Sequence, residues 1–155
     1  MNRSVRCPVA ATLQLVGDRW TLLIVRDLLR GRRRFNELRE SVEGIPPAVL
    51  ASRLRALESA AIVQRRLYQD RPRRFEYRLT PRGHALGVVV GALADWGQRY
   101  AEADLTLVDG ECGHGISVVY HCPTCAREAP RRRVRIVGRE QARLPGRERQ
   151  PTLPE

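Results

Sequence analysis

The order of two hydrophobic patterns in the first hundred residues constrains the fold most strongly. Apolar residues recur at helical spacing through residues 8–60, and strand-like stretches follow at 62–68 and 74–79. A spacing of three or four indicates a helix with one buried face, whereas alternation indicates a half-buried strand. The chain therefore predicts a mainly α fold with one small β-hairpin, of the α+β class.

Glycine, proline and capping residues divide the helical part into segments. Gly17 and Gly31 end two of them, and Asp18 and Thr80 are placed to cap the helices that follow. We expect helices at 8–16, 19–30, 35–41 and 47–60, and one long helix from 81 to about 101. Helices followed by a hairpin with a basic tip are the layout of a winged helix-turn-helix.

The helix predicted at 47–60 has two unlike faces. Leu50, Leu54, Leu57 and Ala61 share the apolar one. The opposite face carries small side chains, which suits a helix that must lie deep in the major groove of DNA. On this helix we predict DNA contacts from Pro47, Ala48, Ala51, Ser52, Arg53 and Arg55. Arg53 lies near the core edge, and contact with a phosphate and pairing with Glu37 or Glu58 both stay open.

Arginine supplies the remaining predicted contacts. All 28 basic residues are arginine and the net charge is +11, of which residues 1–100 carry +10. Such an excess favours a polyanionic partner, nucleic acid before membrane. We expect Arg71 and Arg73, in the loop between the two strands, and Arg34 to contact double-stranded DNA. The longest apolar run is half of what a membrane span needs, so we expect a cytoplasmic protein without a membrane partner.

The sequence resembles the HxlR family of bacterial winged-helix transcription regulators over about two-thirds of its length. The matching residues include Cys7-Pro8, Gly17-Asp18-Arg19-Trp20, Gly31, Arg34-Phe35-Asn36-Glu37-Leu38, Arg53-Leu54, Phe75-Glu76-Tyr77 and Trp96-Gly97. The resemblance implies a homodimer that binds an inverted-repeat operator. It also implies a cysteine before the first helix that senses electrophiles or oxidants in some relatives. Pro46 and Ala51 replace the family's usual serine and threonine, and Ala61 replaces its glycine.

The long helix and Cys7 provide two further predictions, a dimer interface and a redox sensor. The long helix has an apolar side wider than a small core needs, and we predict a dimer interface from Leu86, Val90, Leu93, Trp96 and Tyr100. Cys7 stands at a helix start beside arginines, which favour a reactive thiolate. Cys7 is therefore a candidate redox sensor, and the alternative is a small buried apolar residue.

Four potential metal ligands follow in an acidic segment. Cys112 and His114, then Cys122 and Cys125, form two short knuckles around a stretch at 116–120 that we expect to be a strand. This donor set suits structural zinc in a zinc-ribbon-like extension. His121 in place of His114, reduced thiols without metal, and a redox pair of Cys122 and Cys125 stay open.

The predicted organisation has three parts: a winged helix-turn-helix domain with its dimerisation helix at 1–103, the extension at 104–138, and a disordered basic tail at 139–155. We predict that the protein is a dimeric DNA-binding transcriptional regulator that acts as a repressor. The sequence does not indicate its effector. An RNA-binding module is the alternative, disfavoured by few aromatic residues. A small zinc metalloenzyme is disfavoured because no catalytic motif accompanies the cysteines, so we expect no enzymatic activity.

Overall fold

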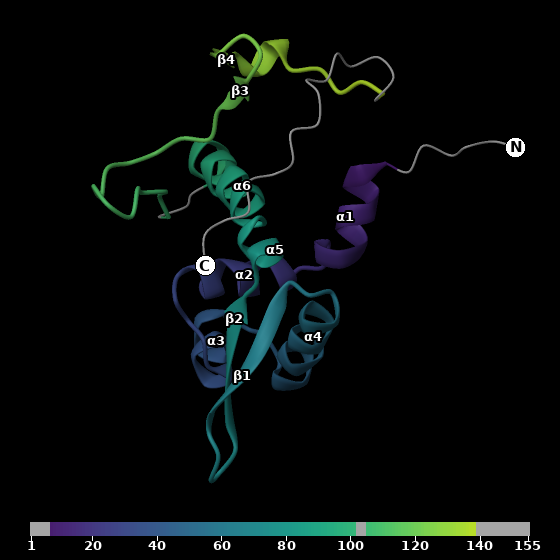
Figure 1. Ribbon diagram of the computed structural model, residues 1–155, viewed down its shortest axis with the longest axis vertical. Helices are drawn as coiled ribbons and strands as arrows, with labels where there is room; N and C mark the ends of the chain where they lie inside the picture. The colour runs from purple at the N-terminus through teal and green to yellow at the C-terminus, as the bar shows by residue number, and fades with distance from the viewer. Residues whose placement is uncertain (1–6, 102–104, 139–155) are drawn as a thin grey trace, which may run out of the picture. The chain divides into compact units, whose positions relative to one another are not determined.

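The computed structural model describes residues 7–101 and 105–138. By its internal contacts the chain divides into two compact units, Met1–Leu93 and Ala94–Glu155. The predicted α+β class is confirmed, since the first unit combines helices with one antiparallel hairpin (Figure 1). The tail predicted to be disordered, 139–155, lies outside the described residues. None of the described helices is both long and apolar enough to span a bilayer.

The first unit contains the predicted succession of elements. They are α1 (Pro8–Val16), α2 (Thr21–Leu29), α3 (Phe35–Ser41), α4 (Pro47–Ser59), β1 (Val63–Gln69), β2 (Arg74–Leu79) and α5 (Pro81–His84), and α6 (Gly87–Tyr100) follows. The antiparallel register pairs Val63 with Leu79 at the base of the hairpin. The hairpin extends beyond the ends of α3 and α4 (Figure 1).

Local chemistry explains the limits of α2. The Asp18 carboxylate accepts hydrogen bonds from the backbone N–H groups of Trp20, at 2.9 Å, and Thr21, at 3.1 Å. It thereby satisfies donors that have no partner inside the helix, as the sequence predicts. At the other end Gly31 adopts a φ of +87°, a conformation that costs glycine little.

The core of this unit lies where α2, α3 and α4 meet the base of the hairpin. Its fully enclosed side chains include Ile24 of α2, Leu38 of α3, and Leu50 and Leu54 of α4. Each helix therefore turns its apolar stripe inward, which leaves the opposite side of α4 on the surface.

The single long helix predicted at 81–101 is wrong. The chain forms α5, a turn at Ala85 and Leu86, and then α6. Leu86 N–H bonds to the carbonyl of Gly83, three residues back, so the helix tightens at this point. Gly83 itself packs so closely under the carbonyl of Ile62 that a Cβ would lie 2.1 Å from that oxygen. Tight packing against the hairpin thus accompanies the break.

The second unit contains a short hairpin of β3 (Tyr120–Cys122) and β4 (Arg127–Ala129), followed by the 3-10 helix η1 (Arg131–Arg133). The strand predicted at 116–120 is wrong, because β3 begins only at Tyr120 and Ile116 instead bonds back to Leu107. Asp95 of α6 holds this unit together. Its carboxylate pairs with Arg99 at 3.1 Å and with Arg131 at 2.5 Å.

Candidate nucleic-acid interface

The outward face of α4 is open, as its sequence predicts. Ala48, Ser52 and Arg55 are exposed, and so is Pro47 at the helix start, while Ala51 on the flank is half-buried. The buried leucines on the other side anchor the helix in the core. A rigid helix thus presents a nearly flat surface with one long cationic side chain.

Arg53 lies on the flank of α4 and has a partner that the sequence did not suggest. Its Nη1 is 3.5 Å from Oδ2 of Asp18, so pairing with Glu37 or Glu58 is wrong. Its Nε is buried and has no hydrogen-bond partner among the described residues. The fold thus brings the flank of α4 within reach of Asp18, which stands just before α2. Arg53 therefore connects the outward helix to α2, and its role in DNA contact stays a prediction.

Asp18 is the counterpart of this contact. Partial burial alone raises the pKa of its carboxyl, but the Thr21 hydroxyl, the N–H groups of Trp20 and Thr21, and the charge of Arg53 together hold that pKa below its ordinary value. One carboxylate therefore caps α2 and also orients α4.

The hairpin tip carries Arg71 and Arg73, both exposed. Arg73 Nε is 3.9 Å from Oδ1 of Asp70, and both side chains are largely in solvent. Such a pair is weak and readily exchanged for another anion. Arg71 has no acidic partner within 4.0 Å in the described part of the chain. The tip therefore offers two guanidinium groups to a polyanion.

Arg34 has a structural contact as well as an exposed position. Its guanidinium lies 4.8 Å from the centre of the Tyr68 ring, and its Nε is 4.0 Å from Glu37. The Glu37 carboxylate accepts the N–H groups of Arg33 and Arg34, at 2.9 and 3.0 Å, and these bonds lower its pKa. Arg34 thus joins the start of α3 to the hairpin.

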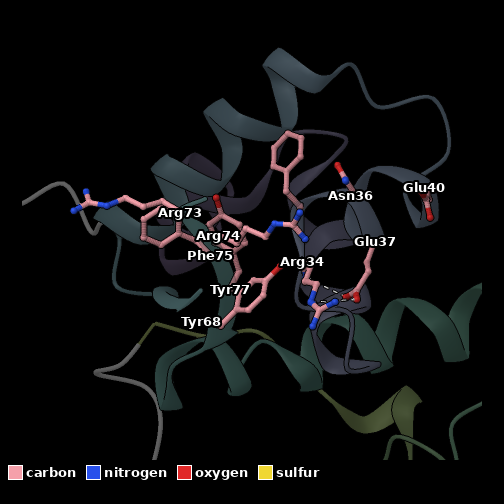
Figure 2. Close-up of a pocket in the computed structure, with 10 residues that line it drawn as sticks. Arg34, Asn36, Glu37, Glu40, Tyr68, Arg73, Arg74, Phe75 and Tyr77 are labelled. Atoms are coloured by element: carbon pink, nitrogen blue, oxygen red, sulfur yellow. Dashed lines mark hydrogen bonds and ion pairs between the residues drawn. The ribbon is translucent and has the colours of Figure 1, made fainter. Parts of the chain in front are cut away.

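A groove of about 640 Å³ separates α3 from the hairpin. Figure 2 shows Arg73, Phe75 and Tyr77 of the hairpin on one side of the groove and Glu37 of α3 on the other, with Arg34 beside Glu37. Glu37 and Glu40, with Arg34 beside Glu37, line the α3 side, and Arg73 and Arg74 line the hairpin side. Because the two signs of charge nearly balance, this groove suits a polyanion less than the hairpin tip does.

Sequence reasoning missed other arginines of the hairpin. Arg66 and Arg74 are exposed on the strands and, among the described residues, lack an acidic partner within 4.0 Å. Arg65 instead pairs with Glu58 at 3.8 Å and lies over the Phe75 ring at 4.4 Å. The alternation along the strands was the signal that separates the outward arginines from the others.

The five residues predicted to form the dimer interface divide into two groups. Leu86 and Val90 pack against the core of their own chain, which accounts for part of the apolar width of this helix. Leu93, Trp96 and Tyr100 are exposed by 53%, 58% and 69%. The Trp96 and Tyr100 rings lie 5.3 Å apart and form one aromatic patch.

The candidate sensor Cys7 and most of the candidate metal ligands are exposed to solvent. Cys7 is exposed and directly precedes α1. Cys112, Cys125 and His114 are exposed and Cys122 is half-buried. Within residues 7–101 and 105–138, no three His, Cys, Asp or Glu side chains come together as a metal site. The structure does not show a zinc ribbon, and zinc stays a prediction.

Comparison with known proteins agrees with this geometry. Residues 15–105 match the model of a family described as HxlR-like helix-turn-helix. Rv3095 of Mycobacterium tuberculosis, named an uncharacterized HTH-type transcriptional regulator, is 38% identical over 130 residues, which are 81% of this chain and 82% of that protein.

Two solved structures are also similar. The crystal structure of PA1607, described as a candidate transcription factor, matches with a TM-score of 0.73 and 30% identity, over 86% of this chain and 96% of that one. The redox regulator HypR in its oxidized form matches with a TM-score of 0.57 and 34% identity, over 64% of this chain and all of the other.

Proposed function

Because this chain belongs to the HxlR-like helix-turn-helix family of transcriptional regulators, we propose that it acts as a homodimer on an inverted-repeat operator. The family is a non-enzymatic class of DNA-binding regulators. In the proposed complex, α4 of each protomer enters the major groove and the hairpin tip contacts the adjacent backbone.

The observation that carries this proposal is the two-sided character of α4. Leu50, Leu54 and Leu57 are enclosed, while Ala48 and Ser52 on the opposite side are exposed. Small outward side chains let the helix backbone approach the base edges, and Arg55 is long enough to reach an acceptor such as guanine.

The hairpin supports the same complex through charge. Arg71 has no acidic partner in the described residues, and Arg73 has a weak, solvated one. Arginines of this kind replace the counterions that surround DNA, so they add affinity without reading sequence.

The exposed patch of Leu93, Trp96 and Tyr100 supports a dimer. Large apolar side chains that stay in water in a single chain favour burial against another. A twofold dimer also sets two copies of α4 about 34 Å apart, the repeat of the major groove along one face of DNA. We propose that the bound dimer represses transcription by occupying the promoter.

Cys7 supports a response to electrophiles. Its thiol is exposed and directly precedes α1, so it is accessible to a reagent in solution. The likeness to HypR, which is named a redox regulator, points the same way. In this proposal, addition of the Cys7 sulfur to an electrophilic carbon changes operator affinity.

Footprinting on the DNA upstream of the gene tests the function. We expect two protected half-sites about one helical turn apart, fewer transcripts from that promoter in vitro, and release by an electrophile that Cys7→Ser abolishes. Ser52→Glu should remove the footprint, whereas His84→Glu, which adds the same charge on α5, should preserve it. Tighter binding to single-stranded RNA than to every duplex would contradict the proposal and favour the RNA-binding alternative.

A further inference from the structure

Two turns of the second unit are built alike, although their sequences differ. The first joins two short paired segments, since Val108 bridges Gly115 and Asp109 N–H bonds to the His114 carbonyl at 2.9 Å. In this turn Oδ1 of Asp109 accepts the N–H groups of Glu111 and Cys112, at 3.0 and 2.9 Å. Gly113 follows with a φ of +71°.

The second turn connects β3 to β4. The Cys122 sulfur accepts the N–H groups of Cys125 and Thr124, and Cys122 pairs with Arg127 across the turn. Ala126 follows with a φ of +48°, which a side chain rarely adopts. The second turn therefore repeats the first, with Cys122 in the place of Asp109, Cys125 in that of Cys112, and Ala126 in that of Gly113.

This correspondence changes the expected ligand set. In each turn the acceptor at the first position and the cysteine three residues later are in contact through hydrogen bonds. Each turn thus presents two donors side by side, one pair O and S and the other S and S. His114 stands outside the repeat, on the returning segment, and its side chain is exposed.

The extension also lacks what usually holds a domain together. No residue of 105–138 is buried, and Ile116, Val119 and Tyr120 are each about half exposed. Segments of this size rarely fold on apolar burial alone and depend on disulfides, metals or a partner. The two ordered turns without a core therefore need a cross-link.

We propose that the two turns together bind one Zn²⁺ through Asp109, Cys112, Cys122 and Cys125, with Asp109 rather than His114 as the fourth ligand. Zinc accepts carboxylate oxygen and thiolate sulfur in a tetrahedral shell. Among the described residues no three such side chains come together as a metal site, so the proposed site requires the two turns to approach each other when the metal binds. The three thiols lose their protons when they bind the metal.

Zinc content and affinity of the untagged full-length protein test this proposal. We expect about one zinc per chain, lost in Cys125→Ser. Asp109→Asn is the decisive variant, because an amide oxygen still accepts the two N–H groups but is a poor zinc ligand. Its affinity, measured by competition with a chromophoric chelator, should fall at least about tenfold. Asp109→Cys should bind zinc with higher affinity than Asp109→Asn, and His114→Ala should have the zinc affinity of the wild-type protein.

Cobalt substitution gives a second readout. Co²⁺ in the wild-type protein should show the absorption of a tetrahedral site with thiolate charge-transfer bands, which weaken in Cys112→Ser. A protein that binds no zinc overturns the site. Loss in His114→Ala combined with retention in Asp109→Asn overturns the role of Asp109. Circular dichroism and duplex binding report whether each variant's first unit is folded.

Discussion

The hairpin tip provides the sharpest test of how the protein holds DNA. Arg71→Ala combined with Arg73→Ala removes two exposed guanidinium groups from each chain, hence four from a dimer. Each phosphate contact contributes about 0.9 to the slope of log affinity against log salt, so the slope should become shallower by about 3.6. The exposed Asp70 lies 3.9 Å from Arg73 and reduces this figure only slightly, since solvent screens the pair.

Fluorescence anisotropy of a labelled duplex, titrated at several salt concentrations, measures the slope. Operator and unrelated duplexes should lose affinity alike, because phosphate contacts carry no sequence information. Arg71→Ala alone should cause half the change, and Arg82→Ala on α5 serves as the matched control, with no change expected. A double variant with the wild-type slope refutes the placement of the hairpin on the backbone. A loss confined to the operator would instead show that the tip reads bases.

Three further predictions concern stability and assembly. Ala61, at a φ of +53° after α4, occupies the same position relative to its helix as Gly31 does after α2. In urea titrations, Ala61→Gly should therefore raise the free energy of unfolding by about 1 kcal/mol, and Gly31→Ala should lower it by a similar amount. A change of the same sign in both variants would contradict this account. The lowered pKa of Asp18 stabilises the fold at pH values above the ordinary pKa of 3.8, and this stability is lost as the pH falls through the folded-state pKa. In urea titrations, the free energies of unfolding of wild type and Asp18→Ala should differ by about 1 kcal/mol at neutral pH and converge in acid. A difference that stays constant with pH would exclude the carboxylate's charge as the cause. Trp96→Ala should weaken the dimer by about 2 kcal/mol per chain in analytical ultracentrifugation, while the thermal midpoint of a diluted sample barely changes. A dimer of unaltered affinity would place the interface elsewhere.

Much of the first unit is determined by neighbours along the chain. Helix α3 has the predicted limits and α4 differs by one residue, because prolines and caps act within a turn of where they stand. Thr80 likewise caps α5 by accepting the N–H of Gly83 at 3.1 Å. The inward leucines and the outward small residues of α4 follow from the helical repeat, so the predicted face could be identified without coordinates.

The errors share a different cause. The break before α6 accompanies the close packing of Gly83 on the hairpin. Leu86 and Val90 pack against the core of their own chain, and the extent of that core cannot be predicted from a local sequence pattern. Arg53 pairs with Asp18, thirty-five positions away in the chain, because the fold brings these two side chains together. A long charged side chain can reach many partners, and only the tertiary structure selects one.

Sequence alone thus determined the elements from α1 to β2, their order, and which side of α4 is free, because those depend on periodicity and on groups a few residues apart. Tertiary structure decided which side chains are partnered and which remain available. It also revealed that Asp109 occupies the position of a cysteine in a second turn, because the two turns share backbone hydrogen bonds and φ angles rather than residue types.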